Sequence, residues 1–80
     1  MSIEEVFQTM QELVAEQFAK EPDEVTMNTS FEDDLGADSL DVFQILMGVE
    51  EAFDIEIDQE EAEKIVSVGD AVEAIKKAIE

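Results

Sequence analysis

The chain has 80 residues and is strongly acidic: 23 Asp and Glu stand against four Lys, which gives a formal net charge of −19 at pH 7. Nucleic-acid binding needs the opposite charge, because basic side chains must displace the counterions of the phosphates. An anionic membrane surface would repel the chain for the same reason. We therefore expect neither nucleic acid nor membrane as a partner, and expect proteins with basic patches instead.

The missing residue types narrow the chemistry further. The chain has no cysteine, which excludes disulfides and zinc–thiolate sites and is compatible with a reducing compartment. It has no histidine, which excludes Ser-His-Asp and Cys-His catalysis. No secretion signal is visible, and no apolar run approaches the roughly 18 residues of a membrane span. We expect a cytoplasmic protein whose residues 1–80 form one domain around one small core.

The first predicted helix begins at Ser2-Ile3-Glu4-Glu5, which has the spacing of a capping box. Apolar residues then recur in steps of three and four, as on one face of a helix: Ile3, Val6, Phe7, Met10, Leu13, Val14 and Phe18. Pro22 predicts the end of this helix or a short turn after it. Residues 25–36 follow as a long loop, which Phe31 and Leu35 are expected to pin to the core.

A second helix is predicted over residues 39–53. Residues 54–57 alternate acidic and apolar side chains, and without a partner strand we expect an ordered connector with Ile57 pointing inward. Asp58 resembles the cap of a short helix that runs through Lys64.

Ser67 is expected to cap the last helix. The apolar stripe of this helix comprises Val68, Ala71, Val72, Ile75 and Ile79. Lys76 and Lys77 lie in its last turn, where cations complement the helix dipole. The sequence thus predicts an all-α fold: a small bundle of three main helices plus one short helix, with a long first loop.

Ser39 is the most informative residue, because it lies at the start of the second predicted helix. Gly36 can adopt the positive φ that the preceding turn needs. Asp38 is a strong candidate for the N-cap, which leaves the Ser39 hydroxyl free to face solvent. A helix start carries unpaired N–H groups and partial positive charge, so it favours a phosphate-bearing substituent at this place. The ordinary role of a lone serine here is capping, which Asp38 already fills.

The second helix carries two apolar stripes. The first has the spacing of a core-facing stripe and comprises Val42, Ile45, Leu46, Val49 and Phe53. The second is displaced by about a quarter turn or more and comprises Leu40, Phe43 and Met47. Apolar residues that are exposed and rimmed by charge indicate an interaction site. The alternative is that the second stripe is the edge of one wide buried face.

Bacterial acyl carrier proteins have an attachment site that resembles the string Asp34-Leu35-Gly36-Ala37-Asp38-Ser39-Leu40-Asp41 of this chain. The resemblance continues through residues 50–57 and 60–65, so it covers nearly the whole sequence. In that family the serine bears 4′-phosphopantetheine through a phosphodiester, and the thiol of this arm carries acyl groups as thioesters. The resemblance implies a discrete, monomeric carrier of type II fatty-acid synthesis that is not itself an enzyme.

The resemblance also implies residue roles. Ser39 would be the hydroxyl to which a phosphopantetheinyl transferase, using coenzyme A and Mg²⁺, attaches the arm. Contacts to partner enzymes would come from Leu40, Phe43 and Met47 as apolar residues and from Asp38, Asp41, Gln44, Glu50 and Glu51 as polar ones. Many members have an acid where this chain has Gln44. Other residues are expected to line a cavity for the acyl chain, by the resemblance and because their spacing turns them toward the inside of the bundle. They are Phe31, Ile45, Leu46, Val49, Phe53, Ile57, Ile65, Ala71 and Ile75.

Two other functions remain open at this point. One is a carrier for polyketide or another specialised acyl or aminoacyl pathway. The other is an acidic interaction protein, such as an inhibitor that mimics nucleic-acid charge, which explains the net charge but not the Asp38-Ser39-Leu40 string. The acidic clusters lack the ligand spacing of an EF-hand, so we expect no dedicated metal site and at most weak binding of divalent ions.

The excess of carboxylates predicts a dependence of stability on salt. Self-repulsion opposes the compact state, and screening or ion binding relieves it. We expect the melting temperature to rise with added NaCl and more steeply with millimolar Mg²⁺ or Ca²⁺, measured by circular dichroism. A melting curve indifferent to both additions would show that charge repulsion does not limit this fold.

Overall fold

The computed structural model describes residues 2–79, and its regular elements are all helices. In chain order they are α1 (Ile3–Phe18), the 3₁₀ helix η1 (Pro22–Glu24), α2 (Ser39–Phe53), α3 (Gln59–Glu63) and α4 (Val68–Ile79). Strand pairing within residues 2–79 is limited to an isolated antiparallel bridge between Ser30 and Ser67. The predicted all-α fold is confirmed. No helix in this part of the chain is both long enough and apolar enough to cross a membrane.

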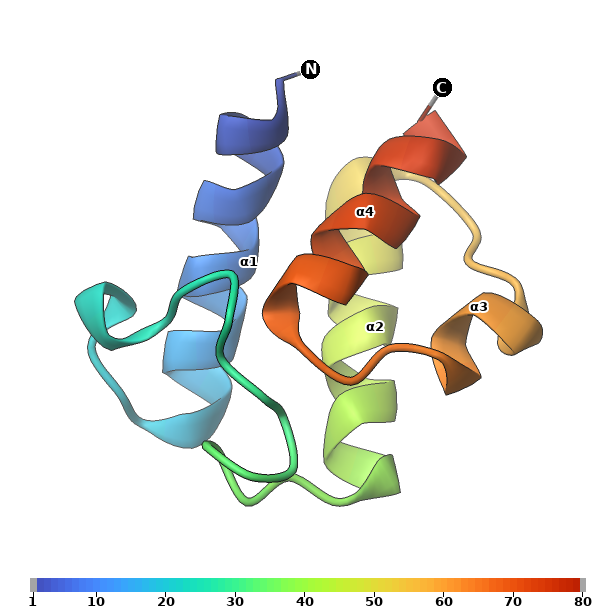
Figure 1. Ribbon diagram of the computed structural model, residues 1–80. Helices are drawn as coiled ribbons and strands as arrows, with labels where there is room; N and C mark the ends of the chain where they lie inside the picture. Colours follow the sequence, from blue (N-terminus) through green and yellow to red (C-terminus); the bar gives the residue numbers. More distant parts are fainter. Residues whose placement is uncertain (1, 80) are drawn as a thin grey trace.

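α1 is the helix against which the rest of the bundle packs. It contacts α2 and α4 and runs antiparallel to both (Figure 1). η1 folds back against α1, and the short α3 lies beside α4. The long loop carries the chain to the end of the molecule where α2 starts, opposite the end where α1 begins and α4 finishes.

The apolar core lies between the three main helices and is completed by the long loop. Its buried side chains are Val6, Met10, Val14, Val25, Phe31, Ala37, Ile45, Val49, Val68, Ala71, Val72 and Ile75. The core-facing stripe of α2 is confirmed, with Val42 and Phe53 half-buried at its edges. Phe31 (2% exposed) and the half-buried Leu35 pin the long loop, as predicted. Ile3 departs from the α1 stripe: at the first position of the helix it remains 46% exposed.

The helix starts follow the predicted caps, and one of the caps lacks a side-chain hydrogen bond. Ser2 Oγ accepts a hydrogen bond from Glu5 N at 3.3 Å, and Glu5 Oε1 accepts one from Ser2 N at 3.5 Å, which confirms the capping box of α1. Ser67 Oγ accepts from Asp70 N at 3.3 Å at the start of α4, as predicted. Asp58 occupies the N-cap position of α3, as predicted, although its side chain makes no capping hydrogen bond. Water can satisfy the N–H groups of so short and exposed a helix.

Backbone hydrogen bonds tie the long loop to the segment at the start of α4. They join Phe31 N to Val66 O (3.0 Å), Val68 N to Thr29 O (2.9 Å) and Gly69 N to Met27 O (2.9 Å). The approach at Gly69 is so close that an added Cβ would lie 2.8 Å from Met27 O. The absence of a side chain at residue 69 therefore permits the loop to reach α4.

Two glycines in helices make a matched test of this packing. We expect Gly69→Ala to lower the free energy of unfolding by about 1–3 kcal/mol, because the backbone of the loop must move away. At Gly48, in α2, an added Cβ would lie at an ordinary 3.7 Å from Leu13 Cδ2. Gly48→Ala should therefore raise the free energy of unfolding by up to about 1 kcal/mol, through helix propensity. Urea denaturation measures both, and equal stability of the two variants would contradict the close approach at Gly69.

Candidate functional site

Ser39 is the first residue of α2, and its neighbours relieve it of the capping role. Asp38 Oδ1 accepts a hydrogen bond from Asp41 N at 3.0 Å, and Asp41 Oδ2 accepts one from Asp38 N at 3.3 Å. Gly36 adopts φ +66 in the turn before the helix, as predicted. The predicted N-cap at Asp38 is confirmed, and the Ser39 side chain is exposed.

The first turn of α2 is electropositive along its backbone and acidic in its side chains. Helix geometry leaves the N–H groups of Ser39 and Leu40 without an intrahelical acceptor, at the positive end of the helix dipole. The carboxylates of Asp38 and Asp41 are held by backbone N–H groups on the capping side. A substituent on Ser39 would lie near both the positive end of the helix dipole and the negative carboxylates. This turn therefore suits a covalently held phosphate better than a free one.

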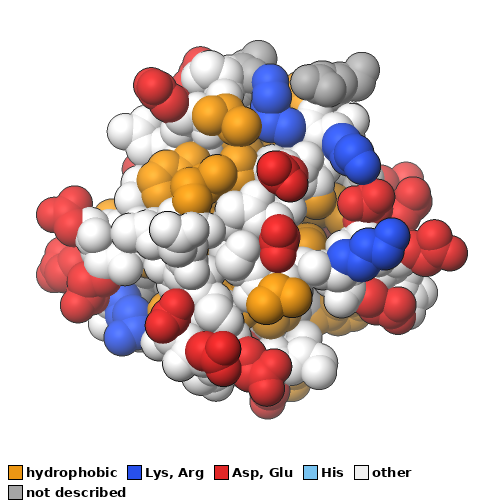
Figure 2. Space-filling model, in the orientation of Figure 1, with side chains coloured by type: hydrophobic (Ala, Val, Ile, Leu, Met, Phe, Trp, Pro, Cys, Tyr) orange, Lys and Arg blue, Asp and Glu red, His pale blue; other side chains and the backbone are white. Residues whose placement is uncertain are grey.

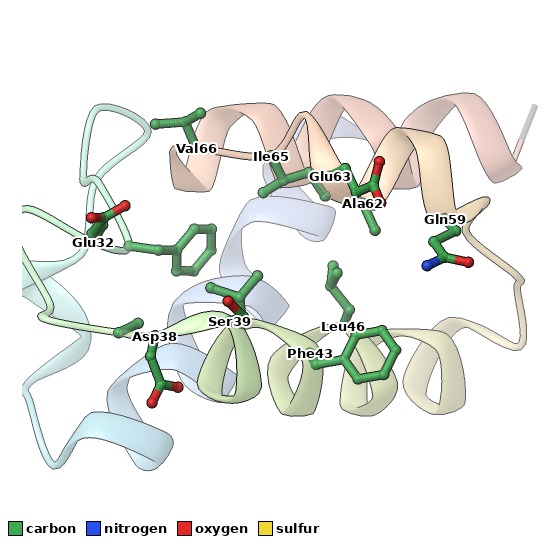
Figure 3. A pocket seen from close by; sticks show the side chains of 13 residues that line it. Glu32, Asp38, Ser39, Phe43, Leu46, Gln59, Ala62, Glu63, Ile65 and Val66 are labelled. Carbon is green, nitrogen blue, oxygen red and sulfur yellow. The ribbon is translucent and has the colours of Figure 1, made fainter.

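A pocket of about 640 Å³ opens beside Ser39, between the first half of α2, α3 and the loop (Figure 3). Its lining residues are Phe31, Glu32, Ala37, Asp38, Ser39, Val42, Phe43, Leu46, Gln59, Ala62, Glu63, Ile65 and Val66. The inner wall is apolar, because Phe31 and Leu46 are buried. Glu32 and Gln59 lie at opposite ends of the view in Figure 3. The pocket therefore combines an apolar interior with polar ends.

The structure separates the predicted cavity residues into two groups. Phe31, Leu46 and Ile65 line the pocket. The other predicted residues pack within the core or at its edge, outside the pocket lining: Ile45, Val49, Phe53, Ile57, Ala71 and Ile75. Inward phase places a residue on the core side of a helix, but it does not distinguish a filled core from the wall of a pocket.

Sequence reasoning did not assign the α3 wall of the pocket. This wall comprises Gln59, Ala62, Glu63 and, beyond the helix, Val66. Their i, i+3, i+4, i+7 spacing is that of one helix face. This spacing is the feature of the sequence that could have indicated the wall. Because two of the four are polar, the face did not read as an apolar stripe. Glu32, Ala37 and Val42 also line the pocket without having been assigned to it.

The second stripe of α2 faces solvent. Leu40, Phe43 and Met47 are 63%, 56% and 59% exposed, which confirms an exposed apolar surface and excludes the edge of a buried face. Large apolar side chains at this exposure, on successive turns of one helix, form a continuous patch that a partner can cover.

The polar residues beside this stripe differ in what they bind. Glu50 is half-buried, and its Oε2 accepts a hydrogen bond from Ile57 N at 2.9 Å. This bond links the connector that follows α2 back to the helix. Gln44 Oε1 accepts from Gln17 Nε2 at 2.7 Å, which links α2 to α1. Glu51 is exposed, and its side chain takes part in neither of these hydrogen bonds. Of the acids near the stripe, Glu51 is thus free of the structural roles that Asp38, Asp41 and Glu50 have.

The surface as a whole is acidic. Acidic side chains lie along both flanks of the face shown in Figure 2, and lysines appear at few places on it. Lys77 Nζ approaches Glu61 Oε1 at 3.9 Å, but both side chains are exposed, so this pair contributes little to stability. Among residues 2–79 no group of three or more acidic side chains is arranged to hold a metal ion.

Comparisons with known proteins agree with this geometry. The family model described as "Phosphopantetheine attachment site" matches residues 8–75. Curated acyl carrier proteins from Clostridium acetobutylicum and Prochlorococcus marinus are each 51% identical to the chain, over 89% and 95% of its length and 92% and 95% of theirs. The solved structure of an acyl carrier protein from Enterococcus faecalis is similar with a TM-score of 0.81 and 40% identity, covering 98% of this chain and 99% of that one. The chain belongs to the acyl carrier protein family, which carries the phosphopantetheine attachment site.

Proposed function

We propose that Ser39 is the residue that carries 4′-phosphopantetheine, and that the protein presents acyl thioesters on this arm to enzymes of fatty-acid synthesis. The observation that carries the proposal is the position of Ser39: an exposed hydroxyl in the first turn of α2, beside a pocket of about 640 Å³ with an apolar interior. Capping by Asp38 supports it, because the serine is free for modification. The protein would act as a carrier and not as a catalyst.

The residues present suit the group. The Ser39 Oγ can lose its proton to a transferase and form the phosphodiester, while coenzyme A releases adenosine 3′,5′-bisphosphate. The free N–H groups of the first turn favour the phosphate so formed. When bound, the group supplies a thiol for the thioester. The apolar pocket that Ser39 lines provides a place where an acyl chain is removed from water.

The partners we propose are a phosphopantetheinyl transferase and fatty-acid synthesis enzymes whose docking surfaces are basic. The exposed stripe of Leu40, Phe43 and Met47 would supply the apolar anchors of these complexes. The net charge of −19 would steer encounters with basic patches from a distance. We place this monomeric carrier in the cytoplasm with the enzymes it serves. Family membership removes the acidic nucleic-acid mimic from consideration.

The attachment site is tested with Ser39→Ala. We expect this variant to stay folded, because Asp38 keeps the cap, and to accept no phosphopantetheine from a transferase and coenzyme A. Intact mass reports the addition, and circular dichroism reports the fold. Peptide mapping of the wild-type protein should place the added mass on Ser39. The added mass of phosphopantetheine on Ser2, Ser30 or Ser67 would overturn the assignment.

The docking surface is tested at Phe43 and Met47. We expect Phe43→Ser and Met47→Ser to change the free energy of unfolding by no more than about 0.5 kcal/mol, as at exposed sites, whereas truncation of a buried Phe costs roughly 3–5 kcal/mol. Both should weaken binding to the transferase, measured by surface plasmon resonance. If Phe43→Ser unfolds the protein, α2 is a core element on this side and the interface lies elsewhere.

Charge steering is tested at Glu51, since changes at Asp41 or Glu50 would also break hydrogen bonds of the fold. Glu51→Lys should lower the association rate with the transferase and the dependence of that rate on salt. Glu12→Lys makes the same change of charge on the exposed side of α1 and serves as the control. Equal effects of the two variants would show that net charge acts without a localised acidic surface.

A further inference from the structure

Asp70, in the first turn of α4, holds the segment that precedes its own helix. Its Oδ2 accepts hydrogen bonds from Val66 N at 3.1 Å and from Ser67 N at 3.2 Å. The bond to Ser67 N completes a capping box, because Ser67 Oγ accepts from Asp70 N. Among the described residues, the corresponding carboxylates of α1 and α2, on Glu5 and Asp41, accept one backbone N–H each. Asp70 therefore fixes one residue more than a capping box requires.

The additional residue, Val66, is the one that carries the long loop. Val66 O accepts a hydrogen bond from Phe31 N at 3.0 Å, and Phe31 O accepts one from Ala37 N at 2.8 Å. Ala37 directly precedes the cap of α2, and Ser39 follows that cap. Figure 1 shows the loop beside the segment that leads into α4. A continuous series of hydrogen bonds thus leads from the Asp70 side chain to the start of α2.

We infer that Asp70 is a positioning residue for the modification of Ser39, although the two lie on different helices. The inference rests on the proposed function of Ser39. Transfer of phosphopantetheine needs the hydroxyl oxygen within attacking distance of the phosphate and in line with it, and a displaced nucleophile loses rate steeply. The body of α2, which carries most of the exposed stripe, is held by its own packing against α1 and the core. Loss of the Asp70 contacts should therefore disturb the reacting hydroxyl more than docking.

Substitutions at residues 70, 67 and 2 separate the hydrogen bonds of Asp70 from its charge and from helix capping. Both bonds end on one oxygen, Oδ2, so the amide oxygen of Asp70→Asn can accept both without the charge. Asp70→Ala removes the charge and the acceptor together. Ser67→Ala is the control for capping, since it removes the bond to Asp70 N and leaves the carboxylate to hold Val66. Ser2→Ala removes the cap of α1, at the opposite end of the molecule from Ser39, and controls for a general loss of stability.

The first measurement is the steady-state rate at which a phosphopantetheinyl transferase modifies each variant with saturating coenzyme A. We expect Asp70→Ala to lower kcat by about tenfold, less than the roughly 10²-fold that a displacement of 1 Å can cost, and to change KM for the carrier by less than about twofold. Asp70→Asn should restore the wild-type kcat. Ser67→Ala and Ser2→Ala should retain it.

The second measurement is amide hydrogen exchange, which needs no transferase. In the wild-type protein the amides of Phe31, Ala37 and Val66 should have similar protection factors, because one local opening exposes them together. Asp70→Ala should lower all three, whereas Ser2→Ala should leave them unchanged, since that opening does not break the cap of α1. If Asp70→Ala does not fold, the wild-type exchange still decides: unrelated protection of these amides would overturn the inference.

The outcomes separate this inference from the proposal beneath it. If the wild-type protein accepts no arm at Ser39, the proposed function fails and the inference fails with it. If the arm is attached but Asp70→Ala keeps the wild-type kcat, or raises KM instead, the inference alone fails. Equal losses of kcat in Asp70→Asn and Asp70→Ala would overturn it, because charge would be responsible. Equal losses in Ser67→Ala and Asp70→Ala would reduce Asp70 to a helix cap.

Discussion

The position of Ser39, the proposed attachment site, depends on the backbone hydrogen bonds between the long loop and the start of α4. These bonds hold Phe31, whose carbonyl in turn accepts a hydrogen bond from Ala37 N at 2.8 Å, directly before the cap of α2. Both residues are buried, so the loop is fixed from the backbone and from the side chains together. A loop of this length would otherwise lose its conformation to entropy. The start of the functional helix is thus set by contacts that are far apart in sequence.

Capping and the proposed modification fall on adjacent residues. The Asp38 side chain accepts a hydrogen bond from the backbone N–H of Asp41 in the first turn. Ser39 keeps an exposed hydroxyl on the same turn. Were the serine itself the cap, its oxygen would be turned toward the backbone, and modification would break the helix start. The acidic neighbours would repel a free phosphate at this turn, whereas the proposed phosphodiester would be kept there by its covalent bond to Ser39.

Sequence patterns predicted the elements well because the signals of a helical bundle are local. The capping residues Ser2, Asp38 and Ser67 and the bounds of helix 39–53 all follow from neighbours within four positions. The bridge between Ser30 and Ser67 could not be predicted, because it joins distant residues without a strand pattern in either.

The candidate site was predicted in its chemistry more than in its shape. Ser39 and the exposed stripe stand out from local spacing alone. The pocket cannot be recognised in this way. The spacing of Ile45 and Val49 places them on the inner side of the helix whether the space beside them is filled or empty. Likewise, an acid such as Glu50 reads as surface charge until the structure shows the backbone N–H of Ile57 that it binds.

α3 is the most weakly anchored wall of the pocket. It has five residues, none of them buried, and no side-chain cap, while the connector before it is tied at Ile57 by Glu50. Local opening of such a segment takes far less free energy than unfolding of the three main helices. The three main helices therefore form a stable framework, and α3 is the part of the pocket wall that opens most easily. Displacing α3 about that tie would change the width of the pocket at a cost that the stability of the core does not set.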